Sequence, residues 1–257
     1  MKFLNSYLFF LIVLFLFSCT SKKEILYLQD IENVAVGSIN YDSPLIQPND
    51  ILKITVDSGI ASIETLMPYN RDNIQTGSNQ SIELIQLNGY LVDIDQTINF
   101  PVLGRLSTLN QTLISLSEKI EHMLEIGGHL DNPIVNVRLL NAKVTILGEV
   151  NNPGTYMFTE QNLSFMQALG YAGDMTINGI RNDVLISREV NGIRKVSHID
   201  LNSSSFMNSQ YYFIKPNDLI IVNPNNPKIK SAGFVGSVGT VATVLSIAIS
   251  LTILITR

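Results

Sequence analysis

Hydrophobic and polar residues alternate in several short stretches, and the first stretch begins shortly after residue 48. Leu52, Ile54 and Val56 alternate with polar residues, which is the period of a half-buried β-strand. A Pro-Asn-Asp turn at residues 48–50 introduces this strand, and a second such turn at residues 216–218 introduces another apolar strand. The repeated device predicts two related modules, each built around strands.

Two further stretches of the first module have the period of strands. Residues 89–105 read as a strand-turn-strand unit, with the corner at Asp95 and Gln96. Residues 135–139 alternate in the same way as the strand after residue 50. At least three strands are therefore expected in this part of the chain.

A helix is expected between these strands. Thr108 or Asn110 could cap its start, and Gly127 could end it. The apolar residues with helical spacing are Leu109, Leu113, Leu116, Ile120 and Leu124. Helix and strands together predict an α+β domain over residues 44–140.

A second, smaller domain is expected over residues 141–223. Its pattern contains a strand over residues 144–156 that is broken by Gly148 and closed by a Pro-Gly turn, and a short helix near residues 163–169. It also contains a hairpin around the Asn-Gly pair at residues 191–192, with a loop longer than two residues. Residues 224–233 are rich in Pro and Asn and read as a stiff linker.

The N-terminus has the pattern of a secretory signal. Lys2 precedes an uncharged apolar run at residues 7–17, which is too short to span a bilayer. A signal peptide is expected at residues 1–18. Cys19 follows it directly and is the predicted lipidation site, although a signal peptide that merely ends in Cys is the alternative. Residues 19–43 then form a lipidated tether without predicted structure.

Residues 234–255 carry no charge and, as a helix of ~33 Å, would cross a hydrocarbon core of about 30 Å. They predict a C-terminal transmembrane helix. Gly239, Thr243, Ser246 and Ser250 recur at helical spacing, which favours a stripe that packs against another helix or lines a pore. The alternative is a single-pass anchor whose hydroxyls bond to their own helix.

Composition and charge exclude several functions. The net charge of −5, without a cluster of Lys and Arg, makes nucleic acid an unlikely partner. One cysteine cannot form an internal disulfide or a cysteine-based zinc site. His122, His129 and His198 are scattered, and the nearby carboxylates Asp93 and Asp95 have no visible catalytic partner. We therefore expect neither an enzyme nor a cofactor.

The ordered motifs resemble the outer-membrane polysaccharide export lipoprotein family. In the first domain they are Pro48-x-Asp50-x-Leu52-x-Ile54-x-Val56, Tyr90-x-Val92-Asp93, Ile98-x-Phe100-Pro101-x-Leu103-Gly104 and Pro133-x-Val135-x-Val137. In the second they are Gly148-Glu149-Val150-x-x-Pro153-Gly154-x-Tyr156 and Asp218-x-Ile220-x-Val222, which resemble the soluble-ligand-binding β-grasp (SLBB) domain. Gln96 departs from the pattern, because that family usually has Gly at this corner.

The resemblance implies a translocon subunit for capsular polysaccharide or exopolysaccharide. Its soluble domains would lie in the periplasm, and copies would form a homo-oligomeric ring with an α-helical barrel pore in the outer membrane. Polysaccharide would be the cargo, and an inner-membrane polysaccharide co-polymerase the partner. The alternative is a non-transporting bitopic lipoprotein that binds glycan or a partner protein through its β-grasp domain.

Overall fold

A computed structural model of the chain describes residues 25–33, 41, 43–59, 61–70, 86–190 and 192–231, together with single positions between 239 and 254. The predicted signal peptide, residues 1–18, and Cys19 lie outside the described residues. Both therefore stay predictions.

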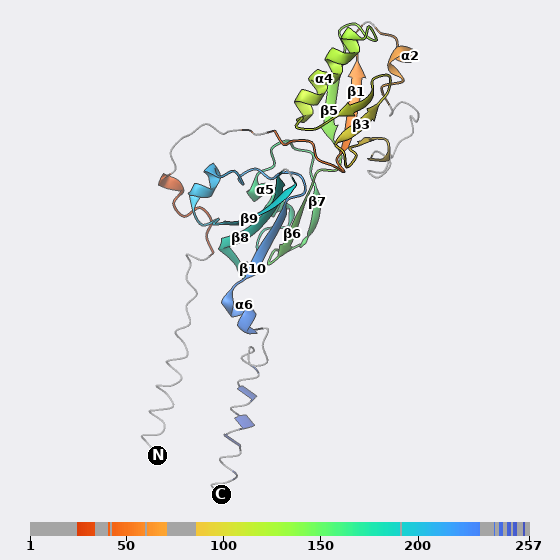
Figure 1. Cartoon of the computed structure of the whole chain (residues 1–257). Helices are drawn as coiled ribbons and strands as arrows, with labels where there is room; N and C mark the ends of the chain where they lie inside the picture. Colours follow the sequence, from red (N-terminus) through yellow and green to blue (C-terminus); the bar gives the residue numbers. More distant parts are fainter. Residues whose placement is uncertain are drawn as a thin grey trace.

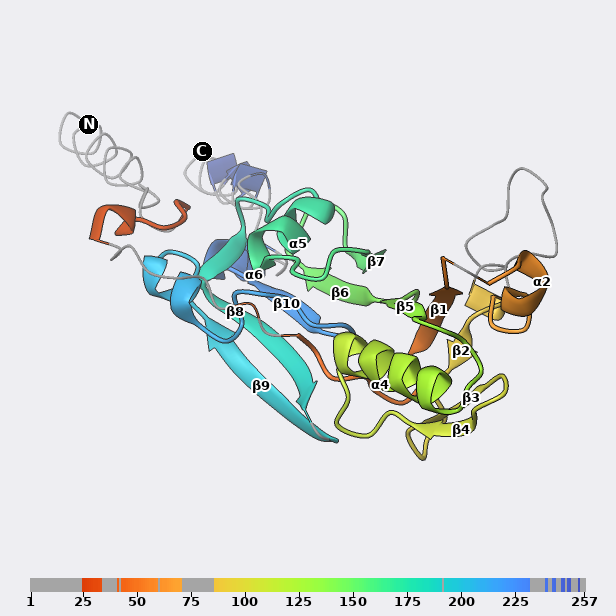
Figure 2. The ribbon, with the colours of Figure 1, turned by 90° about the horizontal axis from the view of Figure 1, so that it is seen from above.

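The first module is a three-stranded antiparallel sheet with one long helix across it. Its elements are β1 (Ile51–Asp57), α2 (Ile63–Leu66), β2 (Tyr90–Leu91), β3 (Thr97–Phe100), β4 (Gly104–Ser107), α4 (Leu113–Ile126) and β5 (Ile134–Leu139). The strand order in the sheet is β2-β1-β5, while β3 and β4 form a separate hairpin. Helix α4 lies along the sheet in both views (Figures 1 and 2). The predicted strands at residues 52–56 and 135–139 are confirmed.

Helix α4 begins with a capping box that the sequence pattern did not single out. Ser115 N donates to Thr112 Oγ1 at 3.1 Å, and Thr112 N donates to Ser115 Oγ at 2.8 Å. The predicted caps, Thr108 and Asn110, lie in the preceding turn, so that prediction was wrong. The buried face is confirmed at Leu116, Ile120 and Leu124.

The strand-turn-strand unit predicted for residues 89–105 is built differently. Strand β2 pairs with β1, whereas β3 and β4 pair with each other across a turn at residues 101–103. The corner nevertheless keeps a left-handed backbone, because Gln96 has a φ of 57°. Its carbonyl accepts hydrogen bonds from Thr108 N at 2.8 Å and from Thr108 Oγ1 at 3.0 Å, which hold the corner in place.

The second module is a mixed five-stranded sheet with a short helix. Its elements are β6 (Lys143–Gly148), β7 (Gly154–Met157), α5 (Phe165–Tyr171), β8 (Gly179–Val190), β9 (Ile193–Ile199), the 3-10 helix η4 (Ser204–Asn208) and β10 (Leu219–Pro224). The strand order is β7-β6-β10-β8-β9, with β10 parallel to β6. Val190 pairs with Ile193, so the Asn-Gly loop has two residues and the longer loop expected there is wrong.

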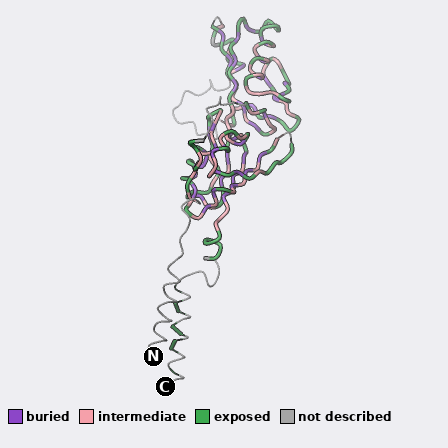
Figure 3. Tube along the Cα trace, turned by 90° about the vertical axis from the view of Figure 1, so that its left-hand side faces the viewer, coloured by how far each residue is buried: buried purple, intermediate pink, exposed green. Residues whose placement is uncertain are grey.

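Each module has its own hydrophobic core, and the buried residues follow the strands of both (Figure 3). Leu139, at the end of β5, packs against both cores and thereby joins the modules. Gly148 ends β6 with a φ of 92°, and a Cβ there would lie 2.0 Å from Val222 O of β10. Only glycine fits this position without a backbone shift.

The two Pro-Asn-Asp turns have the same geometry. In each, the backbone N–H three positions before the aspartate donates to its Oδ2 at 2.8 Å, for both Asp50 and Asp218. The central asparagines, Asn49 and Asn217, have φ values of 69° and 67°. Because Asn adopts this conformation at low cost, the turn can start a strand in both modules.

The C-terminal segment requires a correction. Helix α6 (Asn226–Ser231) occupies part of the predicted linker, residues 224–233. Most of residues 234–255 lie outside the described residues. Within the part of the chain that the structure describes, no helix has the length and apolar character to cross a membrane. The predicted transmembrane helix is therefore wrong, as is the outer-membrane localisation with a spanning helix.

Residues 25–33, here called the N-terminal strap, lie against the second module although they precede the first in sequence (Figure 1). They include the 3-10 helix η2 (Ile31–Asn33). Leu28 N donates to Leu201 O at 3.0 Å, and Gln29 N donates to Asn202 O at 2.7 Å. The sequence pattern contained no signal for this docking.

Candidate functional site

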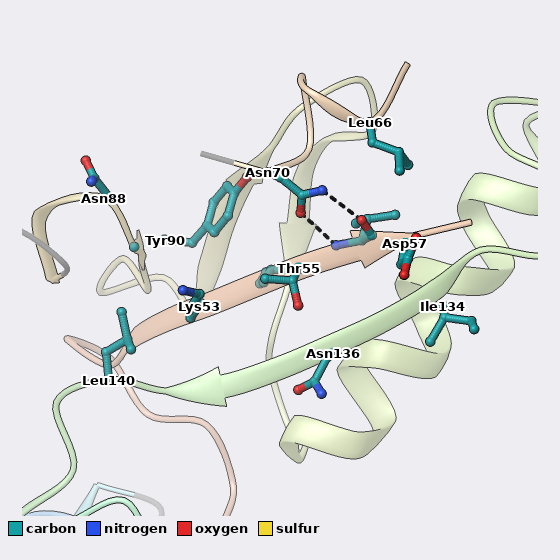
Figure 4. A pocket seen from close by; sticks show the side chains of 13 residues that line it. Lys53, Thr55, Asp57, Leu66, Asn70, Asn88, Tyr90, Ile134, Asn136 and Leu140 are labelled. Carbon is teal, nitrogen blue, oxygen red and sulfur yellow. Dashed lines mark hydrogen bonds between the residues drawn. The ribbon is translucent and has the colours of Figure 1, made fainter. Parts of the chain in front are cut away.

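A pocket of about 600 Å³ lies on the first module's sheet, on the face opposite α4. Strand alternation directs Leu52, Ile54 and Val56 into the core, so the residues between them point out of the opposite face. Thr55 of β1 lies directly across from Asn136 of β5, and both are exposed. These strands form the floor of the pocket (Figure 4).

The rim of the pocket comes from two segments distant in sequence. Leu66 and Asn70 follow β1, while Asn88 and Tyr90 belong to the segment that leads into β2. The Tyr90 ring is buried, and its hydroxyl donates to Tyr69 O at 3.3 Å, so the phenol oxygen is held by the protein. The pocket is thus assembled from strands and turns of one module.

One edge of β1 faces the pocket instead of another strand. In an antiparallel pair, alternate residues direct both backbone groups to the partner, and the residues between them direct theirs away. Leu140 N donates to Ile51 O at 2.8 Å, which aligns the odd-numbered residues of β1 with β5. The backbone groups of Leu52, Ile54 and Val56 therefore point to the other side.

At Val56, the side chain of Asn70 takes the place of a neighbouring strand as hydrogen-bond partner of the backbone. Its Oδ1 accepts from Val56 N at 2.9 Å, and its Nδ2 donates to Val56 O at 2.8 Å (Figure 4). A side-chain amide carries one acceptor and two donor hydrogens, so it can satisfy both backbone groups of one strand residue. Asn70 therefore closes the edge of β1 at its far end.

The middle position, Ile54, lacks such a partner, and the residue is 3% exposed. Leu52 lies opposite Tyr90 of β2, and the same register would place Asn88 opposite Ile54. Asn88 instead lies in the turn before β2. Among the described residues, the N–H and C=O of Ile54 have neither a strand nor a side chain as partner. One donor and one acceptor of the main chain therefore line the pocket.

The charges around the pocket are balanced. Lys53 and Asp57 both line it, from the same face of β1. Asp57 Oδ1 also accepts from Ser58 N at 2.7 Å, which fixes the carboxylate at the end of the strand. In the described ranges, no group of three or more His, Cys, Asp or Glu side chains could hold a metal ion. The neutral polar side chains that line the pocket, Thr55, Asn88 and Asn136, suit a ligand bound through hydrogen bonds.

The residues predicted from sequence do not meet at this pocket. Gly239, Thr243, Ser246 and Ser250 are exposed at helical positions near the C-terminus. Their hydroxyls donate within their own helix, at 2.8 Å from Thr243 to Gly239 O, 3.1 Å from Ser246 to Thr243 O and 2.7 Å from Ser250 to Ser246 O. This is the self-bonded arrangement given as the alternative above, and a packing or pore role stays a prediction.

The other candidate side chains form ordinary surface contacts. Asp95 at the corner before β3 pairs with Arg105 of β4, and both side chains are at least half-exposed. His198 of β9 contacts Asp183 of β8 on the exposed side of the hairpin. Neither pair contributes to the pocket.

The fold defines a chain of two α+β modules, the first of which carries a polar pocket on its open sheet face. Residues 40–140 match the family described as polysaccharide biosynthesis/export protein, and residues 142–222 match the SLBB domain. The chain belongs to the polysaccharide export protein family. Polysaccharide cargo follows from this membership.

Sequence reasoning missed the pocket because its rim lies in a stretch without periodicity. Asn70 and Asn88 flank residues 71–85, and this whole stretch read only as polar loop. The available signal was the polar side of β1, which repeats at Lys53, Thr55 and Asp57. A strand whose outer residues are all polar has a solvent-facing surface, but only the register shows which backbone groups that surface exposes.

Proposed function

We propose that this protein is a subunit of an assembly that exports polysaccharide from the cell. The observation that carries the proposal is the match of an export domain and an SLBB domain over consecutive parts of one chain, residues 40–140 and 142–222. Leu139 supports their action as a unit, because its side chain packs against both hydrophobic cores. Capsular polysaccharide or exopolysaccharide is the proposed cargo.

The protein would act as a passive conduit wall and would not turn over its cargo. Copies would form a homo-oligomeric ring, and an inner-membrane polysaccharide co-polymerase would deliver the chain to it. Exposed apolar side chains of the first module support assembly, since Leu87, Ile94 and Ile126 are largely solvent-accessible in a single copy. Burying such side chains between copies would be favourable.

Lipidation at Cys19 is part of the proposal. Support comes from its position directly after the apolar run at residues 7–17 and from its being the single cysteine of the chain. Incorporation of labelled palmitate by the wild-type chain, and its loss in Cys19→Ser, is the expected result. Equal labelling of both chains would contradict lipidation at this residue.

The test of the main proposal is removal of the protein from its own cell. We expect extracellular polysaccharide to be lost while the enzymes that synthesise it remain present, and a wild-type copy of the chain to restore export. Unchanged extracellular polysaccharide in the deletion strain would overturn the proposal. It would favour the second candidate, a lipoprotein that binds glycan or a partner protein without transport, for which the SLBB match is the supporting observation.

A further inference from the structure

We propose that the pocket beside Ile54 is a saccharide-binding subsite, which takes a sugar unit of the passing polymer through neighbouring hydroxyl groups. The inference rests on the proposed export function and adds a site on the first module. It is carried by the open main-chain edge of β1, together with the neutral hydrogen-bonding side chains around it.

The length of the open edge selects the ligand. An extended peptide that adds to a sheet needs several consecutive strand residues with free N–H and C=O groups. Here β2 covers β1 at Leu52, and the Asn70 side chain covers it at Val56, so only Ile54 remains between them. A peptide strand therefore meets a blocked edge on both sides.

A sugar fits an edge that is one residue long. The N–H and C=O of Ile54 present one donor and one acceptor side by side, because both groups of an extended residue point the same way. A hydroxyl is both a donor and an acceptor. Two hydroxyls on adjacent ring carbons can accept from the N–H and donate to the C=O without any further strand pairing.

The side chains of the pocket extend the same chemistry. Thr55, Asn88 and Asn136 line it and are all exposed, so each can exchange water for a hydroxyl of the ligand. Amide and hydroxyl groups both donate and accept, which suits a ligand whose hydroxyls differ in orientation. The opposite charges of Lys53 and Asp57 select against a ligand with many charges of one sign.

Apolar atoms cover other parts of the pocket wall. Leu66 at the end of α2 contributes them, together with Ile134 at the start of β5 and Leu140 directly after its end. Sugar rings carry apolar C–H faces beside their hydroxyls, and such faces contact aliphatic side chains favourably. Each direct hydrogen bond changes the dissociation constant only about fivefold, so we expect dissociation constants in the millimolar range. Weak binding of this kind lets a polymer move on.

The experiment uses the full chain, labelled for NMR, and two probes. The first probe is an oligosaccharide fraction prepared by mild hydrolysis of the polymer that the cell of origin secretes, and the second is a blocked peptide of alternating Thr and Val. We expect the oligosaccharide to shift the Ile54 amide resonance with saturation at millimolar concentration, and the peptide to leave it unchanged. Asn88→Ala and Asn136→Ala should each weaken binding by about fivefold.

Asn99→Ala is the matched control, because Asn99 is an exposed strand asparagine on β3 outside the pocket. Its affinity should equal that of the wild type. Thermal unfolding of all three variants checks that they fold, and the Ile54 shift in the wild-type chain keeps the test decisive if a variant does not. No Ile54 shift with the oligosaccharide, a shift with the peptide, or equal loss in Asn99→Ala would each overturn the proposal.

The proposed function fails by a different observation. A deletion strain that still exports polymer overturns the export role itself. If the deletion strain loses export but the oligosaccharide does not shift the Ile54 amide resonance, the export role stands and only the saccharide subsite is ruled out.

Discussion

Asp50 and Asp218 occupy equivalent turns, but their surroundings differ in charge. Asp218 is buried and pairs with Arg188, whose Nη2 lies 2.7 Å from Asp218 Oδ2. Asp50 is also buried, yet in the described ranges no cation pairs with it. Burial raises the pKa of Asp50 to about 6, although the hydrogen bond from Gln47 N–H acts in the opposite direction.

The pKa of Asp50 predicts a pH-dependent stability. The carboxyl group binds its proton more tightly in the folded chain than in the unfolded one, where its pKa is 3.8. The contribution of Asp50 to the free energy of unfolding is therefore fully present below pH ~3.8 and is lost as the pH rises through about 6. The total loss is about 3 kcal/mol. We expect Asp50→Asn to remove this pH dependence and to match or exceed wild-type stability at pH 7.

Urea unfolding of the wild type and of Asp50→Asn at pH 5 and pH 7 measures this pH dependence. The difference in unfolding free energy between the two proteins isolates Asp50 from other titrating groups. Asp218→Asn is the comparison variant. It leaves the Arg188 guanidinium buried without its carboxylate, so we expect a loss of about 3 kcal/mol at both pH values. Parallel pH dependence in wild type and Asp50→Asn would contradict the assignment.

At the residue level, local rules identified what depends on neighbours in sequence. The Pro-Asn-Asp motif predicted both turns, because its φ preferences act within four residues. The partner of Asp218 could not be predicted, since Arg188 lies on a different strand. The start of α4 was misplaced because Thr108, Asn110 and Thr112 are all acceptable caps, and Thr108 also has Gln111 at the spacing of a capping box. The local pattern therefore did not select Thr112, which forms the box with Ser115.

Among the elements, the N-terminal strap combines a backbone and a side-chain attachment to the second module. Tyr27 OH donates to Asp174 Oδ1 at 2.5 Å, and the Arg181 guanidinium lies 5.1 Å from the centre of the Tyr27 ring. Burial raises the pKa of Tyr27, so the phenol keeps its proton and remains a donor. At the other end of the strap, Asp30 accepts from Ser204 N at the start of η4.

The strap is expected to open as one unit when Tyr27 is removed. Tyr27→Ala deletes the hydrogen bond to a carboxylate and the ring over Arg181, at a cost of about 2 to 3 kcal/mol to strap docking. Amide hydrogen exchange at Leu28 and Gln29 should then accelerate by about tenfold or more, while the amides of β10 keep their protection. Mass spectrometry of the exchanged full chain can measure both segments.

Tyr41→Ala is the control for this experiment. Tyr41 is an exposed residue outside the strap, and its ring contacts Phe213 at a centroid distance of 5.5 Å. Its removal should leave exchange at Leu28 unchanged. Faster exchange in β10 together with the strap would show global unfolding, which contradicts a separately opening strap.

The elements that could be predicted are those with a strong period. β1, β5 and the buried face of α4 follow from alternation or helical spacing of residues that touch the core. The strap has no such period, because its anchoring contacts come from both backbone and side chains of nine residues, 25–33. Its docking depends on contacts with residues more than 140 positions away, which no local pattern encodes.

For the whole molecule, two modules joined at Leu139 present apolar side chains at separate places. One set, here called the β2 edge, is Leu87, Leu91 and Ile94. The other, here called the α4–β5 corner, is Ile126, the last residue of α4, where the chain turns toward β5. A closed ring requires two different surfaces on each copy that bind each other head to tail, whereas a two-fold dimer uses one surface twice. Two separate apolar surfaces suit the proposed ring.

The C-terminal segment and the pocket are the two features of the whole molecule that were not predicted correctly from the sequence. Apolar length at residues 234–255 predicted a spanning helix, whereas in the part of the chain that the structure describes no helix is long and apolar enough to cross a membrane. The pocket was missed because it forms from polar residues of β1, β5 and two turns that meet only after folding. The proposed assembly can be tested at the exposed apolar side chains of the first module.

A charge placed on either surface should stop assembly. We expect Ile94→Asp and Ile126→Asp each to reduce the mass of the purified protein in mild detergent to that of single copies, because each buries a carboxylate in place of an isoleucine worth about 2 kcal/mol per contact. Val102→Asp is the control, since Val102 is also exposed in the first module but lies on the β3–β4 turn and belongs to neither set.

Mixing the two defective chains distinguishes a ring from a dimer. In a head-to-tail contact between the β2 edge and the α4–β5 corner, each defective chain retains one intact surface, so the mixture should form pairs and nothing larger. The mass measured by light scattering should then be that of two copies, while wild type and Val102→Asp give a larger, uniform species. Single copies for wild type, or full assembly of Ile94→Asp alone, would contradict a ring built through these surfaces.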